Sequence, residues 1–424
     1  MKNKIKVIHL GYSDNYGGAS IAMNRINDAL SLVETIDSKM ATVTASINPE
    51  VICLNSTFID KIFAYFRVRI AYKTVQFLQK TSNQSGRSIN CFPSTVSARL
   101  ATLEFDVLHL HWIGNETIRL EDLAKIKKPI VWTFHDNWPL LGAEHTDIDD
   151  SIRFIEGYSA SNRDELTRGI DIDSWTWKRK KNVFKKVKIQ PIVVSSWLAE
   201  QTKKSYLWKN SIPEIIHNPI KIESWTVLEK KKCREQLNLS EHNKVIVFGA
   251  VNGFTDELKG YRNLEKAVHV LSKILPKDNF TLLVFGDADI KEIRLSETVV
   301  LKSVGKIDDF RLLNTIYCSA DVVAIPSYIE TFGQVAVEAI SCGVPVVAFQ
   351  TSGLIDIIRD DFNGFLCSPF KVEDMAHKLH LAFLSLWDSE KMRRDINSRF
   401  GYLTVAKKYE LLYEKILKNN NEFI

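Results

Sequence analysis

Residues 321–349 read DVVAIPSYIETFGQVAVEAISCGVPVVAF, and this stretch decides the fold class. The runs 321–326 and 345–349 are short, continuous and apolar, which is typical of strands buried on both faces of a sheet. Between them, Thr331-Phe332-Gly333 opens a segment of helical length that continues through Gln334 and Glu338. A strand, a helix and a second buried strand together predict a parallel sheet that helices cover on both faces.

The same alternation fills most of the chain in two series. Strands are predicted at 6–12, 40–45, 106–112, 129–134 and 191–195, and then at 244–249, 280–286, 299–304, 321–326, 345–349 and 364–367. Asn218-Pro219 lies between the series, and such a step favours a turn. We therefore predict an α/β protein with domains at 1–220 and 221–391. Residues 392–424 keep helical periodicity and are expected to form terminal helices that pack back on the first domain.

Composition limits the classes of protein. The chain has 424 residues, 45% hydrophobic and 25% charged, with a formal net charge of +5, which suits a soluble protein with two cores. The charge does not predict nucleic-acid binding. The six cysteines are scattered, which suits a reducing compartment. The apolar run 7–10 is too short for a signal peptide and nothing approaches a membrane span, so a cytoplasmic location is expected.

Two glutamates follow the strand at 321–326, where open α/β sheets bind ligands. Glu330 and Glu338 are eight positions apart, at most about 12 Å along a helix. That span suits a nucleotide sugar whose diphosphate lies over the helix start at Thr331–Gln334. In the alternative interpretation, Glu330 only complements the helix dipole and Glu338 is a solvated helix residue.

Glu330-x7-Glu338, followed by Cys342-Gly343-Val344-Pro345-Val346-Val347-Ala348, resembles the signature of the retaining family 4 glycosyltransferases. The resemblance implies the GT-B fold, two Rossmann-like doubly wound domains facing across a cleft. It also implies that a nucleotide-sugar donor is bound by the residues that match the family's donor motifs: Gly17, Gly18, Lys259, Thr331, Phe332, Gly333, Gln334 and Glu338.

One departure from the family pattern affects the donor phosphates. Relatives usually carry an arginine directly after the glycine that corresponds to Gly249, and this chain has Ala250 there. Lys259 is then the main cation expected at the diphosphate. Arg262 is a second candidate, although an exposed surface arginine is the simpler interpretation.

Histidines and aromatic residues gather at the ends of the strands predicted at 106–112 and 129–134. His135 matches the family histidine near the reacting sugar carbon, so the resemblance assigns His135 and Glu330 as catalytic residues and no protein nucleophile. The alternative is that His135 is a core histidine. Together with 171–180, these segments resemble a bacterial exopolysaccharide subgroup that includes colanic-acid-type transferases. Paired glycines at Gly17-Gly18 allow close approach of a ligand.

No metal or other cofactor is expected. The subgroup often has cysteines after its His-Asp-x-Trp motif, whereas this chain has Glu144 and His145. Three Asp-x-Asp triplets, at 147–149, 171–173 and 287–289, could be taken as metal-binding motifs of the other glycosyltransferase fold, but scattered matches of this kind arise by chance.

Two segments are candidates for contact with an anionic membrane. Residues 178–188 contain seven basic side chains next to Trp175 and Trp177, and 62–78 mix aromatic and basic residues. A lipid-linked acceptor would fit such contact, but a basic helix face is as often merely solvated.

The resulting hypothesis is a retaining hexosyltransferase that moves a sugar from a UDP- or GDP-linked donor to a growing surface polysaccharide, of the exopolysaccharide or O-antigen kind. Its partners would be a nucleotide sugar and a glycan acceptor, with no nucleic acid. Nucleotide-sugar 2-epimerases share the architecture but lack the Glu-x7-Glu segment. A catalytically silent, transferase-like partner protein is the third alternative, because of Ala250.

Overall fold

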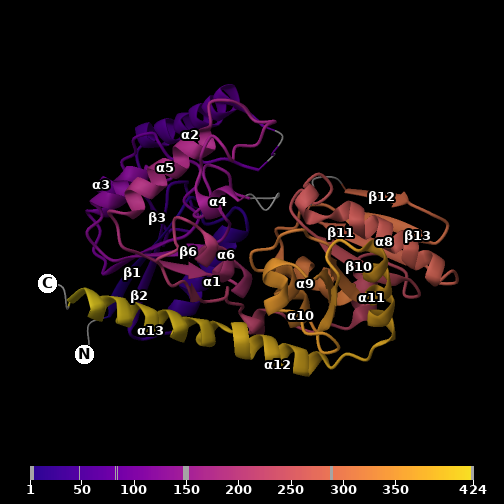
Figure 1. The fold of residues 1–424 in the computed structure, drawn as a ribbon. Coiled ribbons are helices and arrows are strands. Elements are labelled where there is room, and N and C mark those ends of the chain that lie inside the picture. Colours follow the sequence, from indigo (N-terminus) through magenta and orange to yellow (C-terminus); the bar gives the residue numbers. More distant parts are fainter. Residues whose placement is uncertain are drawn as a thin grey trace. The chain divides into compact units, whose positions relative to one another are not determined.

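The computed structural model describes residues 4–46, 48–81, 83, 85–146, 152–286 and 290–421. The chain divides into two compact units, Met1–Pro219 with Tyr402–Ile424, and Ile220–Gly401. Figure 1 shows the two units and the long C-terminal helix that belongs to the first of them. Among the described residues, no helix combines the length and apolar character needed to cross a bilayer.

The first unit is built on a parallel seven-stranded sheet. Its order is β3 (Ile52–Cys53), β2 (Ile36–Thr42), β1 (Ile5–Gly11), β5 (Val107–Leu110), β6 (Ile130–Phe134), β8 (Ile189–Val193) and β9 (Glu214–Ile215). The order reverses between β1 and β5, which makes the carboxyl ends of these two strands the topological switch point where open sheets bind ligands. A separate antiparallel pair joins β4 (Gln79–Lys80) to β7 (Arg168–Gly169).

Helices complete the first unit. They are α1 (Gly18–Leu30), α2 (Phe58–Leu78), α3 (Val96–Leu100), α4 (Arg153–Glu156), α5 (Ile172–Phe184), α6 (Ser196–Lys204) and α13 (Tyr402–Asn421), with a 3-10 helix at Leu120–Lys125. α13 brings Val405, Tyr409 and Tyr413 into the core that Val7 and Ile26 line, so the end of the chain completes the first sheet's packing. Burial of such a face accounts for its helical periodicity.

The second unit repeats the architecture. Its sheet has the order β12 (Ile290–Arg294), β13 (Val299–Val304), β11 (Phe280–Phe285), β10 (Lys244–Gly249), β14 (Val322–Ile325), β15 (Val346–Phe349) and β16 (Gly364–Cys367). All neighbours pair in parallel except β12 and β13. The order reverses between β10 and β14, which is the switch point of this sheet.

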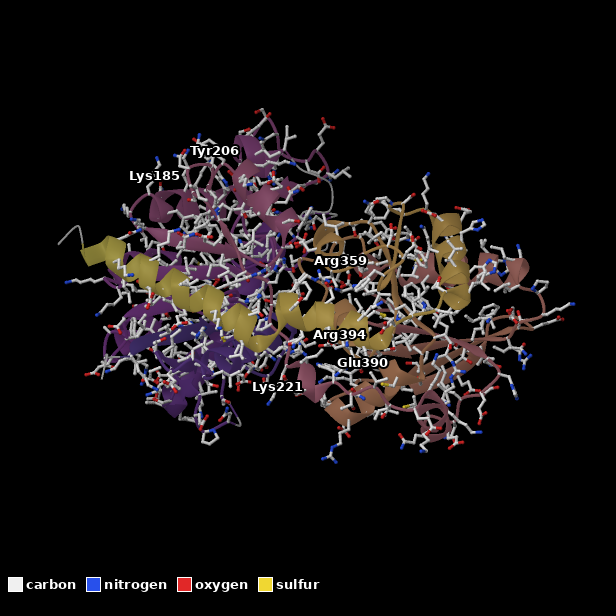
Figure 2. All side chains as sticks on the ribbon, turned by 90° about the horizontal axis from the view of Figure 1, so that it is seen from below. Lys185, Tyr206, Lys221, Arg359, Glu390 and Arg394 are labelled. Carbon is white, nitrogen blue, oxygen red and sulfur yellow. The ribbon has the colours of Figure 1, made fainter. Side chains whose placement is uncertain are left out.

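The helices of the second unit are α7 (Lys230–Gln236), α8 (Tyr261–Ile274), α9 (Phe310–Ser319), α10 (Gln334–Ser341), α11 (Val372–Leu384) and α12 (Ser389–Phe400), with 3-10 turns at Ile222–Ser224, Glu257–Lys259 and Ser352–Asp356. Leu264, Val268 and Leu271 of α8 pack with Met375 and Leu379 of α11 in one apolar cluster against the sheet. α12 lies in this unit, and Figure 2 labels its Glu390 and Arg394.

The predicted fold class is confirmed. Each of the eleven predicted strands corresponds to a strand of the two sheets, because continuous β-branched runs are the local signature of buried parallel strands. The sequence patterns did not predict β3, β4, β7 and β9, which are two residues long, or the antiparallel edge strand β12. A two-residue strand has no periodicity to detect, and β12 contains Lys291, Glu292 and Arg294, which do not mark a buried strand.

Candidate functional site

Two of the predicted site residues meet at the switch point of the second sheet. Lys259 follows β10 and Glu330 follows β14, and these strands are direct neighbours. Lys259 Nζ donates to Glu330 Oε1 over 2.7 Å. Both side chains are mostly buried, at 28% and 21% exposure. Burial lowers the pKa of Lys259, but the charge and hydrogen bond of Glu330 outweigh burial and hold that pKa above its ordinary value.

The loop that carries Lys259 is pressed against the segment after β14. Tyr328 N donates to Leu258 O over 2.8 Å. Gly260 has a φ of 69°, and a Cβ at this position would lie 2.0 Å from Pro326 O. Only glycine permits both this conformation and this approach. Packing alone therefore requires a glycine at Gly260 of the Lys259-Gly260 motif.

Glu330 is fixed by its surroundings. Ser327 Oγ donates to Glu330 Oε1 over 3.0 Å, and Glu330 N donates to Ser352 Oγ over 2.7 Å. Gly353 N donates to Glu330 O over 2.7 Å, which ties the loop after β15 to the loop after β14. Ser327 and Ser352 were not predicted as site residues, although both lie just beyond a strand end, the signal that identified Glu330.

Helix α10 starts directly after this loop. Gly333 is its N-cap at a φ of 110°, and no side chain caps the helix start. Phe332 is buried and packs edge-on against Phe400. The residues named for the phosphates, Thr331 through Gln334, thus do form the turn into a helix, whose backbone N–H groups suit an anion.

Glu338 lies within α10, eight positions after Glu330, and is buried, with 6% of its surface exposed. Tyr317 Oη donates to Glu338 Oε2 over 3.0 Å. The alternative interpretation of Glu338 as a solvated helix residue is therefore wrong. Tyr317 supplies a hydrogen bond that this buried carboxylate needs, since unpaired burial of a charge is costly. Tyr317 was missed because it lies on α9, away from any strand end.

Ala250 directly follows β10, whereas Arg262 lies further along the chain on α8. A Cβ on Gly249 would lie 2.0 Å from the Phe285 ring, so β10 ends on a glycine for steric reasons. Arg262 is exposed on the first turn of α8. The interpretation of Arg262 as a surface arginine agrees with this exposure.

In the first unit, histidines from three adjacent strands stack at one sheet edge. His9 of β1 pairs in register with His109 of β5. His9 Nδ1 and His111 Nε2 are 2.8 Å apart, and His111 Nδ1 and His135 Nε2 are 2.9 Å apart. His135 is thus the outer member of a hydrogen-bonded row of three imidazoles.

Burial sets the charge state of this row. It lowers the pKa of His9 to about 3 and that of His135 to about 4, against a smaller raising effect of Asp136 on His135. The pKa values of His109 and His111 are also well below the ordinary value, chiefly because of burial. All four imidazoles are therefore neutral near pH 7, and His135 is suited to hydrogen bonding rather than to ion pairing.

The alternative interpretation of His135 is a core histidine, and its neighbours His9, His109 and His111 are core histidines. His109 Nδ1 bonds Tyr413 Oη and His109 Nε2 bonds Thr133 Oγ1, each over 2.7 Å. Among the described residues, His9, His109 and His111 are also the one group of His, Cys, Asp or Glu whose geometry could hold a metal ion. Their mutual and hydroxyl hydrogen bonds use every ring nitrogen except His9 Nε2.

Asp136, next to His135, extends the polar cluster. His145 Nδ1 lies 2.6 Å from Asp136 Oδ2, and Trp112 Nε1 donates to the same oxygen over 2.7 Å. His145 Nε2 in turn lies 2.8 Å from Ser88 Oγ. Burial raises the pKa of Asp136, but the surrounding donors outweigh it and lower the pKa overall. Ser88 and His145 were not predicted as site residues.

The glycine pair lies at the start of α1. Gly17 caps the helix at a φ of 84°, and a Cβ on either Gly17 or Gly18 would meet nothing within 4 Å. The pair therefore leaves the helix start open at the switch point of the first sheet, while the conformation alone requires glycine at Gly17.

Of the three Asp-x-Asp triplets, 147–149 and 287–289 lie outside the described residues. Asp171 caps α5 and pairs with Arg153, and Asp173 pairs with Arg87 over 3.1 Å. Both carboxylates of 171–173 therefore have structural partners.

Only some of the basic side chains of residues 178–188 are exposed at the surface. Lys180 is fully buried, and its Nζ donates to Trp138 O and to Leu141 O and Gly142 O, the last two over 3.1 and 2.6 Å. Arg179 pairs with Glu121 over 2.7 Å. Treating the whole stretch as one membrane-facing or solvated face is therefore wrong at Lys180, whereas Lys178, Lys185, Lys186 and Lys188 are exposed. Lys185 and Tyr206 of the first unit, both labelled in Figure 2, line a cavity.

Two doubly wound parallel sheets with ligand-binding switch points define the GT-B fold of glycosyltransferases, and solved structures agree. Sucrose-phosphate synthase from Thermosynechococcus elongatus matches with a TM-score of 0.67 and 18% identity, over 98% of this chain and 100% of that one. Anabaena Alr3699/HepE in complex with UDP and glucose matches with a TM-score of 0.61 and 17% identity, over 97% and 99%.

Residues 229–399 match the family described as Glycosyl transferases group 1. A protein of the cps region of Klebsiella pneumoniae, itself uncharacterized, is 24% identical over 91% of this chain and 99% of its own length. The uncharacterized glycosyltransferase MJ1607 of Methanocaldococcus jannaschii is 26% identical over 53% of this chain, and the match spans only 60% of that relative. Residues 229–399 are thus similar to the group 1 glycosyltransferases, and the solved structures show the GT-B fold for the whole chain.

Proposed function

We propose that the protein is a retaining glycosyltransferase that transfers a hexose from a UDP- or GDP-linked donor to a growing surface polysaccharide. The observation that carries the proposal is the constellation of Lys259, Glu330 and buried Glu338 around the start of α10, inside the segment that matches the group 1 family. The Klebsiella relative encoded in a cps region favours a surface glycan.

Each residue has a role that its chemistry permits. Lys259 neutralises the donor diphosphate, which lies over the N-terminus of α10 at Thr331–Gln334. In the first unit, the open helix start at Gly17 and Gly18 is a second backbone site for an anion. Glu330 accepts hydrogen bonds from sugar hydroxyls, and Glu338 from the ribose. Neutral His135 binds the transferred sugar or the acceptor. No protein nucleophile is assigned. The acceptor hydroxyl attacks the sugar carbon from the face that the diphosphate leaves, and its proton passes to the departing phosphate. The protein groups stabilise the negative charge that develops on that phosphate.

We further propose that the acceptor is lipid-linked and that α2 brings the protein to the cytoplasmic face of an anionic membrane. α2 exposes an unusual set of large apolar side chains: Phe58, Ile59, Ile62, Phe63, Tyr65, Phe66, Ile70, Tyr72 and Phe77. Lys61, Arg69 and Lys73 are exposed among them. The one acid of α2, Asp60, completes the capping box with Thr57 and pairs with Arg99. Basic residues among exposed aromatic ones suit an anionic lipid surface.

A donor screen tests the assignment. UDP- and GDP-sugars are added to the full chain, and thermal stabilisation and slow donor hydrolysis are measured, since a ligand of the native state raises the melting temperature. One nucleotide is expected to stabilise the chain, and one of its sugars to be hydrolysed slowly. If no nucleotide stabilised the protein, the silent-partner alternative would replace the proposal. Conversion of a UDP-sugar to its 2-epimer would support the epimerase.

A further inference from the structure

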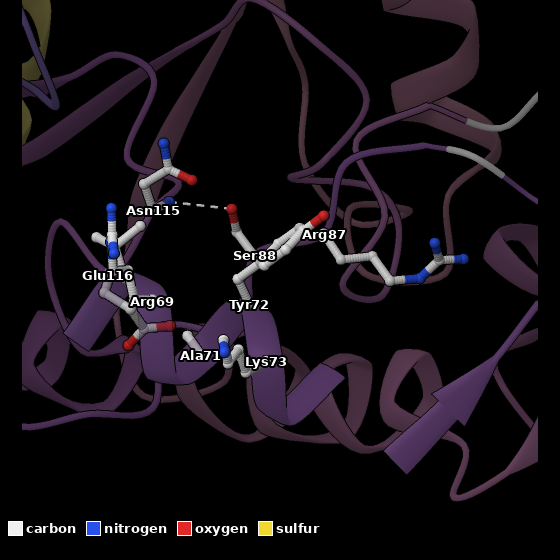
Figure 3. Close-up of a pocket in the computed structure, with 9 residues that line it drawn as sticks. Arg69, Ala71, Tyr72, Lys73, Arg87, Ser88, Asn115 and Glu116 are labelled. Carbon is white, nitrogen blue, oxygen red and sulfur yellow. Dashed lines mark hydrogen bonds between the residues drawn. The ribbon is translucent and has the colours of Figure 1, made fainter. Parts of the chain in front are cut away.

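A pocket of about 420 Å³ lies beneath α2 in the first unit, and it contains none of the residues to which a role in binding the donor has been proposed. This volume falls in the range of small-ligand sites, roughly 300–1,000 Å³. Figure 3 shows its lining side chains, which come from α2, from the segment at 87–88 and from the turn after β5. They are Val68, Arg69, Ala71, Tyr72, Lys73, Arg87, Ser88, Asn115 and Glu116.

Glu116 supplies an acceptor without a partner. Its side chain is 1% exposed, and its Oε2 accepts from Phe92 N over 2.9 Å. Its Oε1 is buried and has no hydrogen-bond partner among the described residues. Buried polar atoms are almost always paired, so an unpaired carboxylate oxygen in a pocket wall points to a ligand hydroxyl.

The cations of the pocket come from α2. Arg69 and Lys73 are exposed, lie one helical turn apart, and form no ion pair with another described residue. Arg69 is stacked over Tyr65, 4.2 Å from the ring centroid. Arg87 differs, because its guanidinium pairs with Asp173 and extends away from Glu116 in Figure 3. A pair of uncompensated cations beside a carboxylate suits a ligand with both a negative group and hydroxyls.

A chain of side-chain contacts connects the pocket to Asp136, the residue after His135. Ser88 lines the pocket and its Oγ lies 2.8 Å from His145 Nε2. His145 Nδ1 contacts Asp136, the residue after His135, over 2.6 Å. Asn115 N also donates to Ser88 Oγ, over 3.0 Å (Figure 3). The pocket is therefore attached to the sheet edge where the proposed reaction takes place, on the helix proposed to touch the membrane.

We propose that this pocket is the acceptor subsite and that it binds a negatively charged sugar, with the negative group on Arg69 and Lys73 and a sugar hydroxyl on Glu116. The inference rests on the proposed function and specifies its acceptor. The negative group is either the phosphate that links a sugar to its lipid or a carboxylate of the sugar itself, and both share the same recognition chemistry.

Binding is tested by thermal stabilisation of the full chain, with the donor site filled by the nucleotide that the donor screen selects. Glucose 1-phosphate, glucuronic acid and glucose are the probes. Wild type and Lys127→Ala, which removes an exposed lysine of the first unit outside α2 and outside the pocket lining, should be stabilised by a charged probe and not by glucose. The better charged probe identifies the source of the negative group. Equal stabilisation by glucose, or none by either charged probe, overturns the proposal.

Transfer is tested in the same proteins. In Arg69→Ala with Lys73→Ala, the shift caused by the charged probe should disappear, and the acceptor KM should rise roughly tenfold or more while donor hydrolysis reports the donor site separately. Glu116→Gln keeps an oxygen for Phe92 N and should raise the acceptor KM as well. An unchanged acceptor KM in the double variant refutes the pocket assignment. If the wild type hydrolysed no donor, the proposed function would be refuted instead.

Discussion

Lys259 Nζ and Glu330 Oε1 are 2.7 Å apart, although the residues are 71 positions apart in the chain. The contact joins the ends of the two strands that flank the switch point of the second sheet. In this arrangement the two side chains form an ion pair at the position proposed for the diphosphate and the sugar of the donor. A donor is expected to exchange this ion pair for phosphate on Lys259 and hydroxyls on Glu330.

Glu330→Ala should therefore abolish sugar transfer. We expect at least a ~100-fold loss, the size seen when a preorganised electrostatic group is removed. The free energy of unfolding should fall by only about 1–3 kcal/mol, because the pair is partly solvated and the fold is expected to retain a positive margin. Initial rates with the donor found in the screen, and denaturant unfolding, measure the two effects.

Glu390→Ala is the matched control for Glu330→Ala, since Glu390 is an exposed glutamate of the same unit on α12. It should leave transfer and stability unchanged. Transfer by Glu330→Ala at the rate of this control would remove Glu330 from the mechanism.

Glu338→Gln tests the ribose contact. A buried carboxylate is a stronger hydroxyl acceptor than an amide, so the donor KM should rise roughly tenfold with little change in the acceptor KM. Tyr317→Phe serves for comparison, because it removes the hydroxyl that hydrogen-bonds to Glu338 Oε2 but leaves the carboxylate. It should cost about 1–3 kcal/mol of stability and change the donor KM less. If both variants changed the donor KM equally, Glu338 would have a structural role.

The sequence predicts the two sheets and the start of α10, because buried parallel strands and glycine turns have local signatures. It does not predict which loops meet. Ser352 is 22 positions from Glu330 and Lys259 is 71, and only the strand order β10, β14, β15 brings them together. The pocket beneath α2 depends on a turn in which Asn115 and Glu116 have φ values of 50° and 55°, and no periodic pattern marks such a turn.

The surface of α2 leads to a prediction on membrane binding. Phe63→Ser combined with Phe66→Ser should abolish most binding to vesicles that contain phosphatidylglycerol, and raising the salt concentration should weaken binding of the wild type, because each basic residue contributes about 1 kcal/mol near such a surface. Vesicle co-sedimentation measures both. Leu386→Ser, at a fully exposed position of the second unit, should bind like wild type. Equal binding of the wild type to uncharged vesicles would argue against an electrostatic contribution to membrane binding.

The histidine row predicts a loss of stability in mild acid. The folded-state pKa values of His9 and His135, about 3 and 4, lie below the ordinary value of about 6.5. Above that value neither state is protonated, and the stability contribution is complete. As the pH falls below about 6.5, only the unfolded chain takes up these protons, so stability should fall by up to about 1.4 kcal/mol per pH unit for each imidazole. Denaturant unfolding between pH 7.5 and about 5 measures this slope.

Glu144 should act in the opposite direction. Burial, and then the charge of Asp173, raise the pKa of Glu144 to about 8, above its ordinary value of 4.5, so the folded chain keeps this carboxyl protonated at neutral pH. The contribution is complete below about pH 4.5 and is lost as the pH rises toward 8, because only the unfolded chain releases the proton. Glu144→Gln retains an uncharged side chain of the same shape and should remove this term. Its stability should therefore rise more steeply than that of wild type between pH 5 and 7.5, and parallel curves would show that Glu144 is ionised in the folded protein.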